Sequence, residues 1–237
     1  MKKTGLKPWL QQQGCIPEVS AEFVTALADV LEVYAEPYAP TWPKGNVDET
    51  TKHLLTEPRP PLPAQPGRPQ RDDDAYERKG TRHLFLFVEP QAGRRPVQVT
   101  KQRTKLDFAH AMQWLVDEGD PEATVMRGVL DNRNTQKSAS LYEAFAPAEA
   151  RRIARKLALH DTPKHGRWLN MAEIECSVLQ HQCRDRRIPD EATLTRAIAA
   201  WEHPRHTEQV TIDGRFAVSD ARNKLKRLSP SLLNQSA

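Results

Sequence analysis

The chain has 237 residues, of which 38% are hydrophobic and 28% are charged. These values are typical of a globular protein with one full domain plus extensions, or with two small domains, and such a chain can bury a sizeable core. The longest apolar runs, such as 84–88, are too short to span a bilayer, and no apolar stretch follows the basic N-terminus. Neither a membrane segment nor a secretory signal is therefore expected.

The formal net charge is only +4, but two segments concentrate the positive charge. Such clusters suit the phosphate backbone of a nucleic acid, whereas a solvated helix face explains either cluster alone equally well. The first segment contains Arg151, Arg152, Arg155, Lys156, Lys164 and Arg167, and the second contains Arg222, Lys224, Lys226 and Arg227.

Three cysteines are an odd number. Cys176 and Cys183 lie seven residues apart in a predicted helix, which separates them by about 10 Å along its axis and is too far for a disulfide. Reduced thiols of a cytoplasmic protein are the simpler interpretation. Together with His181 they would make a possible zinc site, but no second pair of ligands has the spacing that zinc sites show, so zinc is disfavoured.

The first third of the chain predicts a helix, a short strand and a long loop. The helix covers Ala21–Tyr34, with Ser20 as its N-cap and apolar residues at helical spacing. Three prolines between 37 and 43 end it, and Lys44–Glu49 is a possible strand, although its first three residues make it a poor one. Six prolines between 58 and 69 exclude a central helix or strand and predict an extended surface loop, followed by a solvated acidic run at 72–74.

The middle of the chain predicts a hairpin, a helix and a strand. His83–Glu89 and Arg95–Lys101 are strands, and the turn residues between them indicate an antiparallel pair. Thr104 is expected to cap a helix over Lys105–Glu118. The apolar run Thr124–Leu130 then predicts a strand that ends at Asp131.

The remaining elements complete an α/β pattern. Residues Leu141–Leu157 are broadly helical with an interruption near Pro147, Leu157–His160 is a short strand, 163–166 is a loop, and Leu169–Arg186 is a long amphipathic helix. Mixed strand directions with helices on both sheet faces fit a layered α/β architecture. The ribonuclease H-like fold has this order, with antiparallel strands first and parallel strands after.

Three acidic residues stand where this fold would gather a site. Asp48 ends the first strand, Asp131 ends a later one, and Glu173 lies in the first turns of the last long helix. Parallel neighbouring strands would place the two aspartates side by side at the edge of the sheet where sites gather, and the helix would add a third carboxylate. Glu175 is two residues further on and is expected to point elsewhere.

Carboxylates are the ligands that Mg²⁺ prefers, and two such ions can activate an attacking oxygen and stabilise a leaving one. Each acid also has a simpler interpretation. Asp48 could begin a loop, Asp131 beside Asn132 could be a turn residue, and Glu173 could be a favourable charge at a helix N-terminus. The nucleotide-binding, serine-hydrolase and zinc-protease motifs are absent from the sequence.

Several blocks of sequence, in order, resemble the mariner-like insertion-sequence transposases of bacteria, which carry a DDE endonuclease domain. The strongest block is Trp168–Glu175, with the sequence WLNMAEIE. The other blocks are Val47–Lys52, Asp107–His110, Leu130–Asn132, Ser140–Phe145, Thr162–Gly166, Arg186–Pro189 and Ala221–Leu228.

The resemblance implies a ribonuclease H-like core with three catalytic carboxylates that bind Mg²⁺, for which Mn²⁺ can substitute. By position these fall on Asp48, Asp131 and Glu173. The implied reaction is hydrolysis at transposon DNA ends followed by attack of the freed 3′-hydroxyl on target DNA. Lys164, His165 and Arg167 precede the helix that bears Glu173, so we expect them to border the site and contact phosphate.

Two departures from the family pattern leave an alternative open. Lys44, Gly45 and Asn46 replace the apolar strand that usually precedes the first aspartate, and Gln136 replaces a histidine that often follows the second. The alternative is a catalytically degenerate, transposase-derived protein that binds DNA or supports assembly.

The expected organisation follows from the same resemblance. Residues 1–40 would be a helical linker left from a helix-turn-helix region, 41–190 the catalytic domain, and 191–237 a basic, helical C-terminal extension. The expected partners are DNA, a second copy of the chain on that DNA, and a separately encoded helix-turn-helix subunit. The expected location is the cytoplasm, in association with the nucleoid.

Overall fold

The structure is a computed structural model, and it describes residues 20–59, 62–69, 71, 74–131, 137–183, 186–212 and 220. Several sequence predictions lie outside these residues. They concern the first residues of the N-terminal extension, the first two aspartates of the acidic run, Gln136, and the basic C-terminal cluster.

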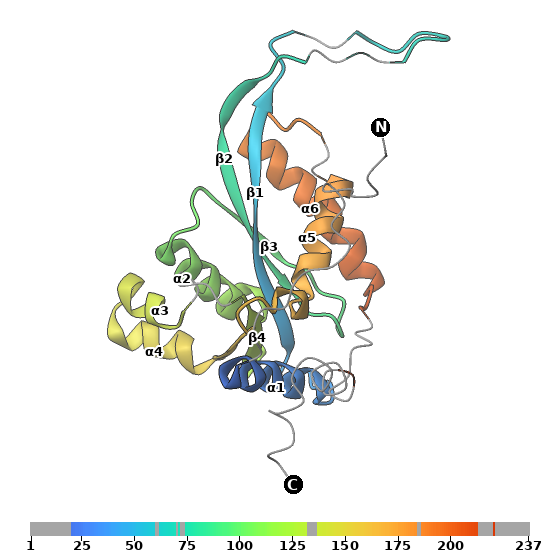
Figure 1. Cartoon of the computed structure of the whole chain (residues 1–237). Helices are drawn as coiled ribbons and strands as arrows, with labels where there is room; N and C mark the ends of the chain where they lie inside the picture. The colour runs from blue at the N-terminus through green and yellow to red at the C-terminus, as the bar shows by residue number, and fades with distance from the viewer. Residues whose placement is uncertain are drawn as a thin grey trace, which may run out of the picture.

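A mixed five-stranded sheet forms the centre of the molecule, in the order β3-β2-β1-β4-β5 (Figure 1). Strands β1, β2 and β3 pair antiparallel, and β4 and β5 add parallel to β1. An antiparallel meander followed by parallel strands is the predicted topology. The strands are β1 Lys44–Thr56, β2 Glu77–Val88, β3 Val97–Thr100, β4 Met126–Leu130 and β5 Leu157–Asp161.

Helices cover both faces of this sheet. In Figure 1, α5 and α6 lie on one side of the strands and α2, α3 and α4 on the other, while α1 crosses the base. The helices are α1 Ala21–Ala35, α2 Lys105–Trp114, which continues as a π-turn over Leu115–Gly119, α3 Ala139–Ala144, α4 Pro147–Arg155, α5 Ala172–Cys183 and α6 Glu191–Glu208. A 3₁₀ turn over Arg167–Leu169 precedes α5.

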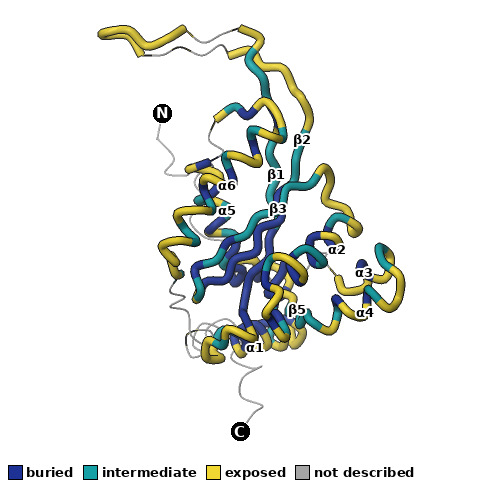
Figure 2. The backbone as a smooth tube through the Cα atoms, turned by 180° about the vertical axis from the view of Figure 1, so that it is seen from behind, coloured by how far each residue is buried: buried dark blue, intermediate teal, exposed yellow. Residues whose placement is uncertain are grey.

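The alternation of β2 explains the two layers. Phe85 and Phe87 are buried in the core formed with α2, α3 and α4, whereas Leu84, Leu86 and Val88 are buried in the core formed with α5 and α6. Successive side chains of a strand point to opposite faces, so an apolar run of five residues supplies both cores. Figure 2 shows the buried backbone concentrated in the lower part of the sheet, while the upper parts of β1 and β2 are intermediate or exposed.

Local signals in the sequence placed most helices correctly. The Ser20 side chain accepts a hydrogen bond from the backbone N–H of Phe23 and begins α1. Thr104 and Asp107 form a reciprocal capping box that begins α2. Pro147 starts α4, so the predicted interruption is confirmed. The last predicted helix was wrong in extent, because α5 begins at Ala172 rather than Leu169 and ends at Cys183.

The prediction of a short first strand was wrong. β1 continues through Asp48 to Thr56, because residues 46–56 find antiparallel partners along the whole of β2. Asp48 therefore lies inside a strand and not at its end. The parallel pairing with β4 stops at Val47, and this boundary is what places Asp48 at an edge.

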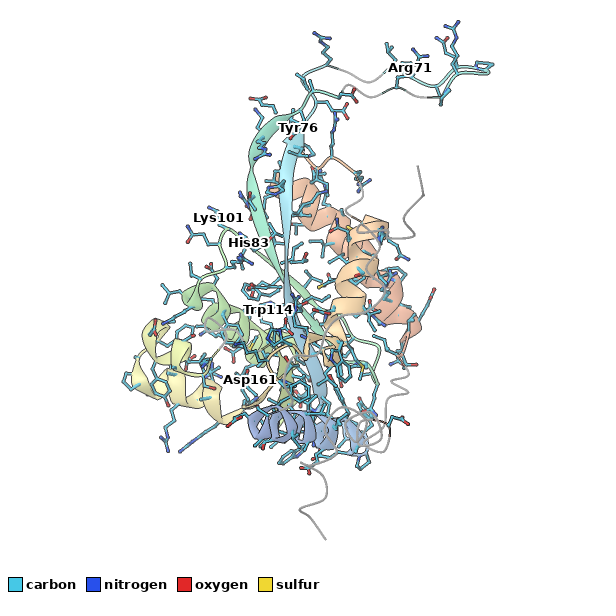
Figure 3. All side chains as sticks on the ribbon, viewed as in Figure 1. Arg71, Tyr76, His83, Lys101, Trp114 and Asp161 are labelled. Atoms are coloured by element: carbon cyan, nitrogen blue, oxygen red, sulfur yellow. The ribbon has the colours of Figure 1, made fainter. Side chains whose placement is uncertain are left out.

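Beyond the helices, β1 and β2 project as an exposed arm (Figures 1 and 2). Isolated backbone bridges join Leu62 to Arg71 and Gln65 to Arg68, so the proline-rich segment returns on itself as an extended surface element. Figure 3 shows Arg71 near the far end of this arm and Tyr76 near its base. No helix in the described residues is long and apolar enough to cross a membrane.

Candidate active site

Asp48 and Asp131 come from neighbouring parallel strands. Val47 is the register partner of Leu130, so the residue that follows each one occupies the same level of the sheet. Val47 and Leu130 are buried in the core beneath α2, which directs the two aspartates to the opposite face, toward α5. Only 4% of Asp48 and 2% of Asp131 are exposed. The strands thus bring two nearly buried acids side by side.

Glu173 reaches the same place through a tight connection between β5 and α5. The backbone N–H of Thr162 donates to the carbonyl of Leu130, 2.8 Å away, and keeps the chain beside β4. Gly166 packs so closely on Pro163 that a Cβ atom there would lie 2.5 Å from the proline ring. The 3₁₀ turn and α5 follow at once, which places Glu173 in the first turn of α5.

Arg167 connects two of the three acids. Its Nε atom lies 2.8 Å from Oδ2 of Asp131, and its Nη2 atom lies 2.7 Å from Oε1 of Glu173. Partial burial by itself would lower the pKa of Arg167, but the charges of Asp131, Glu173 and Asp48 outweigh it and raise that pKa. All three acids therefore act on one guanidinium group.

Asn170 anchors the acidic residues to each other, and sequence reasoning did not assign it a role. Its side-chain N–H donates to the carbonyl of Val47 at 2.9 Å and lies 3.5 Å from Oδ1 of Asp131, while its side-chain oxygen accepts from the N–H of Ala172. It thereby caps α5 and ties that helix to β1. The available signal was its place in the WLNMAE block, because asparagine is a favoured helix cap.

The polar start of β1 is part of the same scaffold. Asn46 is 1% exposed and accepts hydrogen bonds from the Tyr34 hydroxyl and from the N–H of Met171. Lys44 donates to the carbonyl of Glu36. At Gly45, an added Cβ atom would lie 2.1 Å from the ring of Phe87. These three residues disfavour a strand by propensity, but Lys44 and the side-chain oxygen of Asn46 find partners in other elements, and the Phe87 ring occupies the space beside Gly45.

A family model described as "DDE superfamily endonuclease" matches residues 46–195, which include Asp48, Asp131 and Glu173. The chain belongs to this family. No curated protein matches it.

Solved structures similar to this DDE endonuclease include the Mos1 transposase paired-end complex with the left transposon end and the Mos1 strand transfer complex. Each has a TM-score of 0.54 at 10% identity and covers 85% of this chain. The Mos1 mariner paired-end complex with Mn has a TM-score of 0.51 at 8% identity. This likeness concerns the fold and confirms the ribonuclease H-like sheet. The chain spans 62% of the length of each of these chains.

Glu175 faces away from the site, as its position on the helix predicts. Its Oε2 atom lies 2.9 Å from Nε of Arg95, and 8% of the Glu175 side chain and 1% of the Arg95 side chain are exposed. This buried ion pair joins α5 to the loop before β3. Glu175 is thus committed to the interior of the endonuclease fold.

The other basic residues predicted at the site are exposed. Lys164 and His165 are exposed in the connection before α5, and His165 has a φ of 67°, in the left-handed region. In the basic cluster of α4, Arg152 bridges Asp117 and Glu149 at the surface. Cys176 and Cys183 are free thiols.

Asp131 and Glu173 contact the Arg167 guanidinium, and the charge of Asp48 acts on the same group. Among the described residues, no group of three or more histidine, cysteine, aspartate or glutamate side chains is arranged to hold a metal ion. The donor set still fits a hard divalent cation, because it consists of carboxylate oxygens at a point where a positive group already resides.

Proposed function

We propose that this DDE endonuclease is the catalytic part of a transposase, which cleaves DNA at transposon ends and joins the freed ends to target DNA. Asp48, Asp131 and Glu173 would be its catalytic carboxylates and would hold Mg²⁺, or Mn²⁺ in its place. The observation that carries this proposal is the convergence of all three acids on the guanidinium of Arg167. Carboxylates gathered near a single positive charge favour the binding of a cation.

The two aspartates and the glutamate would contribute to this site in different ways. Asp48 and Asp131 are nearly buried, so their positions are fixed by the sheet, and Glu173, with 33% of its side chain exposed, closes the site from the helix. When bound, divalent cations would supply activation of the attacking oxygen and stabilisation of the leaving one. The low dielectric around the two aspartates strengthens their hold on positive charge.

DNA would lie over the exposed side of this site. Lys164 and His165 precede the turn that carries Arg167, and all three are exposed where a phosphate backbone would approach Glu173. Phosphate contacts of this kind position a duplex without reading its sequence. The similar Mos1 structures are a paired-end complex with the left transposon end and a strand transfer complex, and this supports transposon ends and target DNA as the substrates.

The finer assignments belong to the same proposal. We infer a bacterial insertion-sequence origin, action as a homodimer on DNA, and recognition of the ends by a helix-turn-helix region or subunit. The three-part division at residues 40 and 190 and a cytoplasmic, nucleoid-associated location complete it. These assignments rest on the sequence resemblance.

One observation favours the alternative of a DNA-binding protein without catalysis. Arg167 engages Asp131 through Nε and Glu173 through Nη2, along one edge of its guanidinium, and a permanent pairing of this kind would exclude a metal. The two functions differ in whether a divalent cation enters the site.

Asp131→Asn tests the proposed function, because it keeps the size of the side chain and removes the charge that would hold the metal. With cognate transposon ends, Mg²⁺ or Mn²⁺ and the end-recognition subunit supplied, we expect cleavage and strand transfer to be lost while DNA binding survives. Asp117→Asn, which removes a surface acid paired with Arg152, should leave cleavage intact. Undiminished metal-dependent cleavage by Asp131→Asn would refute the assignment, and an inactive wild type would support the alternative.

A further inference from the structure

Arg167 occupies an unusual position for a surface arginine. Fifty-eight per cent of its side chain is exposed, yet its guanidinium contacts Asp131, of whose side chain only 3% is exposed. More than half of the side chain is therefore exposed, while its Nε and Nη2 atoms contact the acids of the site. Arg152 offers a comparison, because it also bridges two carboxylates, but both of its partners are surface residues.

Because the acids are buried, the contact with Arg167 matters for their electrostatic energy. Ion pairs between exposed groups contribute little, but buried carboxylates that lie near each other repel strongly unless a cation compensates them. Asp48 and Asp131 are adjacent and nearly buried, and Glu173 joins them through the same guanidinium. Arg167 thus supplies positive charge where the proposed function requires a divalent cation.

The backbone around Arg167 holds the side chain at the site entrance. The residue opens a 3₁₀ turn between Gly166, which is packed against Pro163, and the buried Leu169. The N–H of Asn170 donates to the carbonyl of Arg167 at 2.8 Å. The backbone is fixed, but the exposed stem leaves the side chain room to turn outward.

We propose that Arg167 is a resident counter-ion of the carboxylate site, which holds the acids together without metal and competes with the divalent cation for them. This inference rests on the proposed function. On metal entry the guanidinium leaves Asp131 and Glu173 and turns to the exposed side, where it contacts a DNA phosphate. DNA phosphate therefore favours metal entry, because it gives the displaced guanidinium a new anionic partner.

Calorimetric titration with Mn²⁺ tests the competition without any measurement of activity. We expect Arg167→Gln to bind Mn²⁺ at least about 10-fold more tightly than the wild type, since the competing charge is gone. The Mn²⁺ affinity of Arg167→Lys should lie between those of the wild type and Arg167→Gln, because lysine keeps the charge but cannot reproduce the paired contacts of Nε and Nη2 with Asp131 and Glu173. Arg152→Gln is the matched control and should bind Mn²⁺ like the wild type. Thermal unfolding gives a second readout, in which Arg167→Gln melts lower than the wild type without metal and gains more from Mn²⁺.

The possible results separate this inference from the proposed function. Mn²⁺ binding that is equal or weaker in Arg167→Gln, but is lost in Asp131→Asn, overturns the counter-ion role and keeps the metal site. An absence of Mn²⁺ binding in the wild type and in a folded Arg167→Gln alike overturns both. If Arg167→Gln does not fold, Arg167→Lys decides, and an affinity no higher than that of the wild type overturns the competition.

Discussion

The side-chain N–H of Asn170 donates to the backbone carbonyl of Val47 across 2.9 Å. This single bond joins the start of the helix that carries Glu173 to the strand that carries Asp48, immediately before the aspartate. The same asparagine accepts a hydrogen bond from the N–H of Ala172 at the start of α5. It therefore fixes the position of the first turn of α5 relative to β1. The distance between two of the proposed catalytic acids therefore depends on a residue that is itself not acidic.

We predict that Asn170→Ala lowers the free energy of unfolding by about 2 kcal/mol, since a buried carbonyl and a helix N-terminus both lose a partner. Asn170→Asp should be worse, because it keeps the cap but loses the donor and adds a negative charge near Asp131. Chemical denaturation checks the order of the two variants. An Asn170→Asp protein more stable than Asn170→Ala at neutral pH would contradict this role.

Gly45 should tolerate no side chain while Phe87 is present. Gly45→Ala places a methyl group against the Phe87 ring, and we expect a loss of about 1–3 kcal/mol in unfolding free energy from overpacking. The double variant with Phe87→Leu removes the obstructing ring, so the two changes should be markedly non-additive. Denaturation of the wild type, both single variants and the double variant measures the coupling, and simple additivity would show that the close approach is not the cause.

The raised pKa of Glu202 predicts that the free energy of unfolding depends on pH. Burial raises its pKa to about 7, while a hydrogen bond from the Val97 N–H acts in the opposite direction. The folded protein then holds a proton that the unfolded chain releases near the ordinary value of 4.5, so the unfolding free energy falls as pH rises from 4.5 to about 7.

Glu202→Gln keeps an acceptor for Val97 and cannot ionise. Between pH values of about 5 and 8, it should lose less stability than the wild type. Glu89, with a pKa of about 7 raised by burial, still contributes in the variant, as do other groups whose pKa is shifted, such as His206. Glu208→Gln, at the exposed end of the same helix, controls for the change in net charge. Identical pH profiles for Glu202→Gln and the wild type would argue against a buried, protonated Glu202.

Lys164 should contribute to DNA affinity through charge alone. Lys164→Gln is expected to weaken binding equally for different sequences and to reduce the slope of log affinity against log salt by about 0.9, the loss of one phosphate contact. Lys105→Gln removes the same charge on the other face of the sheet, where Lys105 pairs with Glu143, and should leave the slope unchanged. Filter-binding measurements over a range of salt concentrations would detect the difference. Unchanged salt dependence in Lys164→Gln would identify Lys164 as solvated surface.

Strand β1 shows most clearly which parts of the fold the sequence could predict. The order of elements followed from local patterns, since caps such as Ser20 and Thr104 act within a few residues of themselves. The length of β1 did not follow, because its partner β2 lies across the proline-rich segment and pairing over that distance leaves no local pattern. Lys44 and Asn46 also argued against a strand, because their hydrogen-bond partners are distant in sequence. These partners come from the end of α1 and from the turn before α5.

The candidate site divides in the same way. Asp48 and Asp131 were identified from their places at the ends of predicted strands, and Glu173 from a helix start within the WLNMAE block. In the fold, all three influence the charge of one guanidinium. Arg167 was expected at phosphate, and its contacts with Asp131 and Glu173 were not foreseen. Sequence spacing indicates which residues share a region, but the direction of a long, flexible side chain depends on charges that only the folded chain assembles.

The ladder between β1 and β2 changes register between Leu54 and Leu55, near the base of the exposed arm. On the site side of this irregularity the pairing runs without interruption from Asn46 to Leu54, and on the other side the strands continue into the arm. A bulge of this kind bends a strand locally and breaks the continuity of its hydrogen bonds. The bend therefore lies between the exposed arm and the part of β1 that holds Asp48. A force on the arm is expected to deform the strand pair at this irregularity before it displaces the aspartate from the sheet.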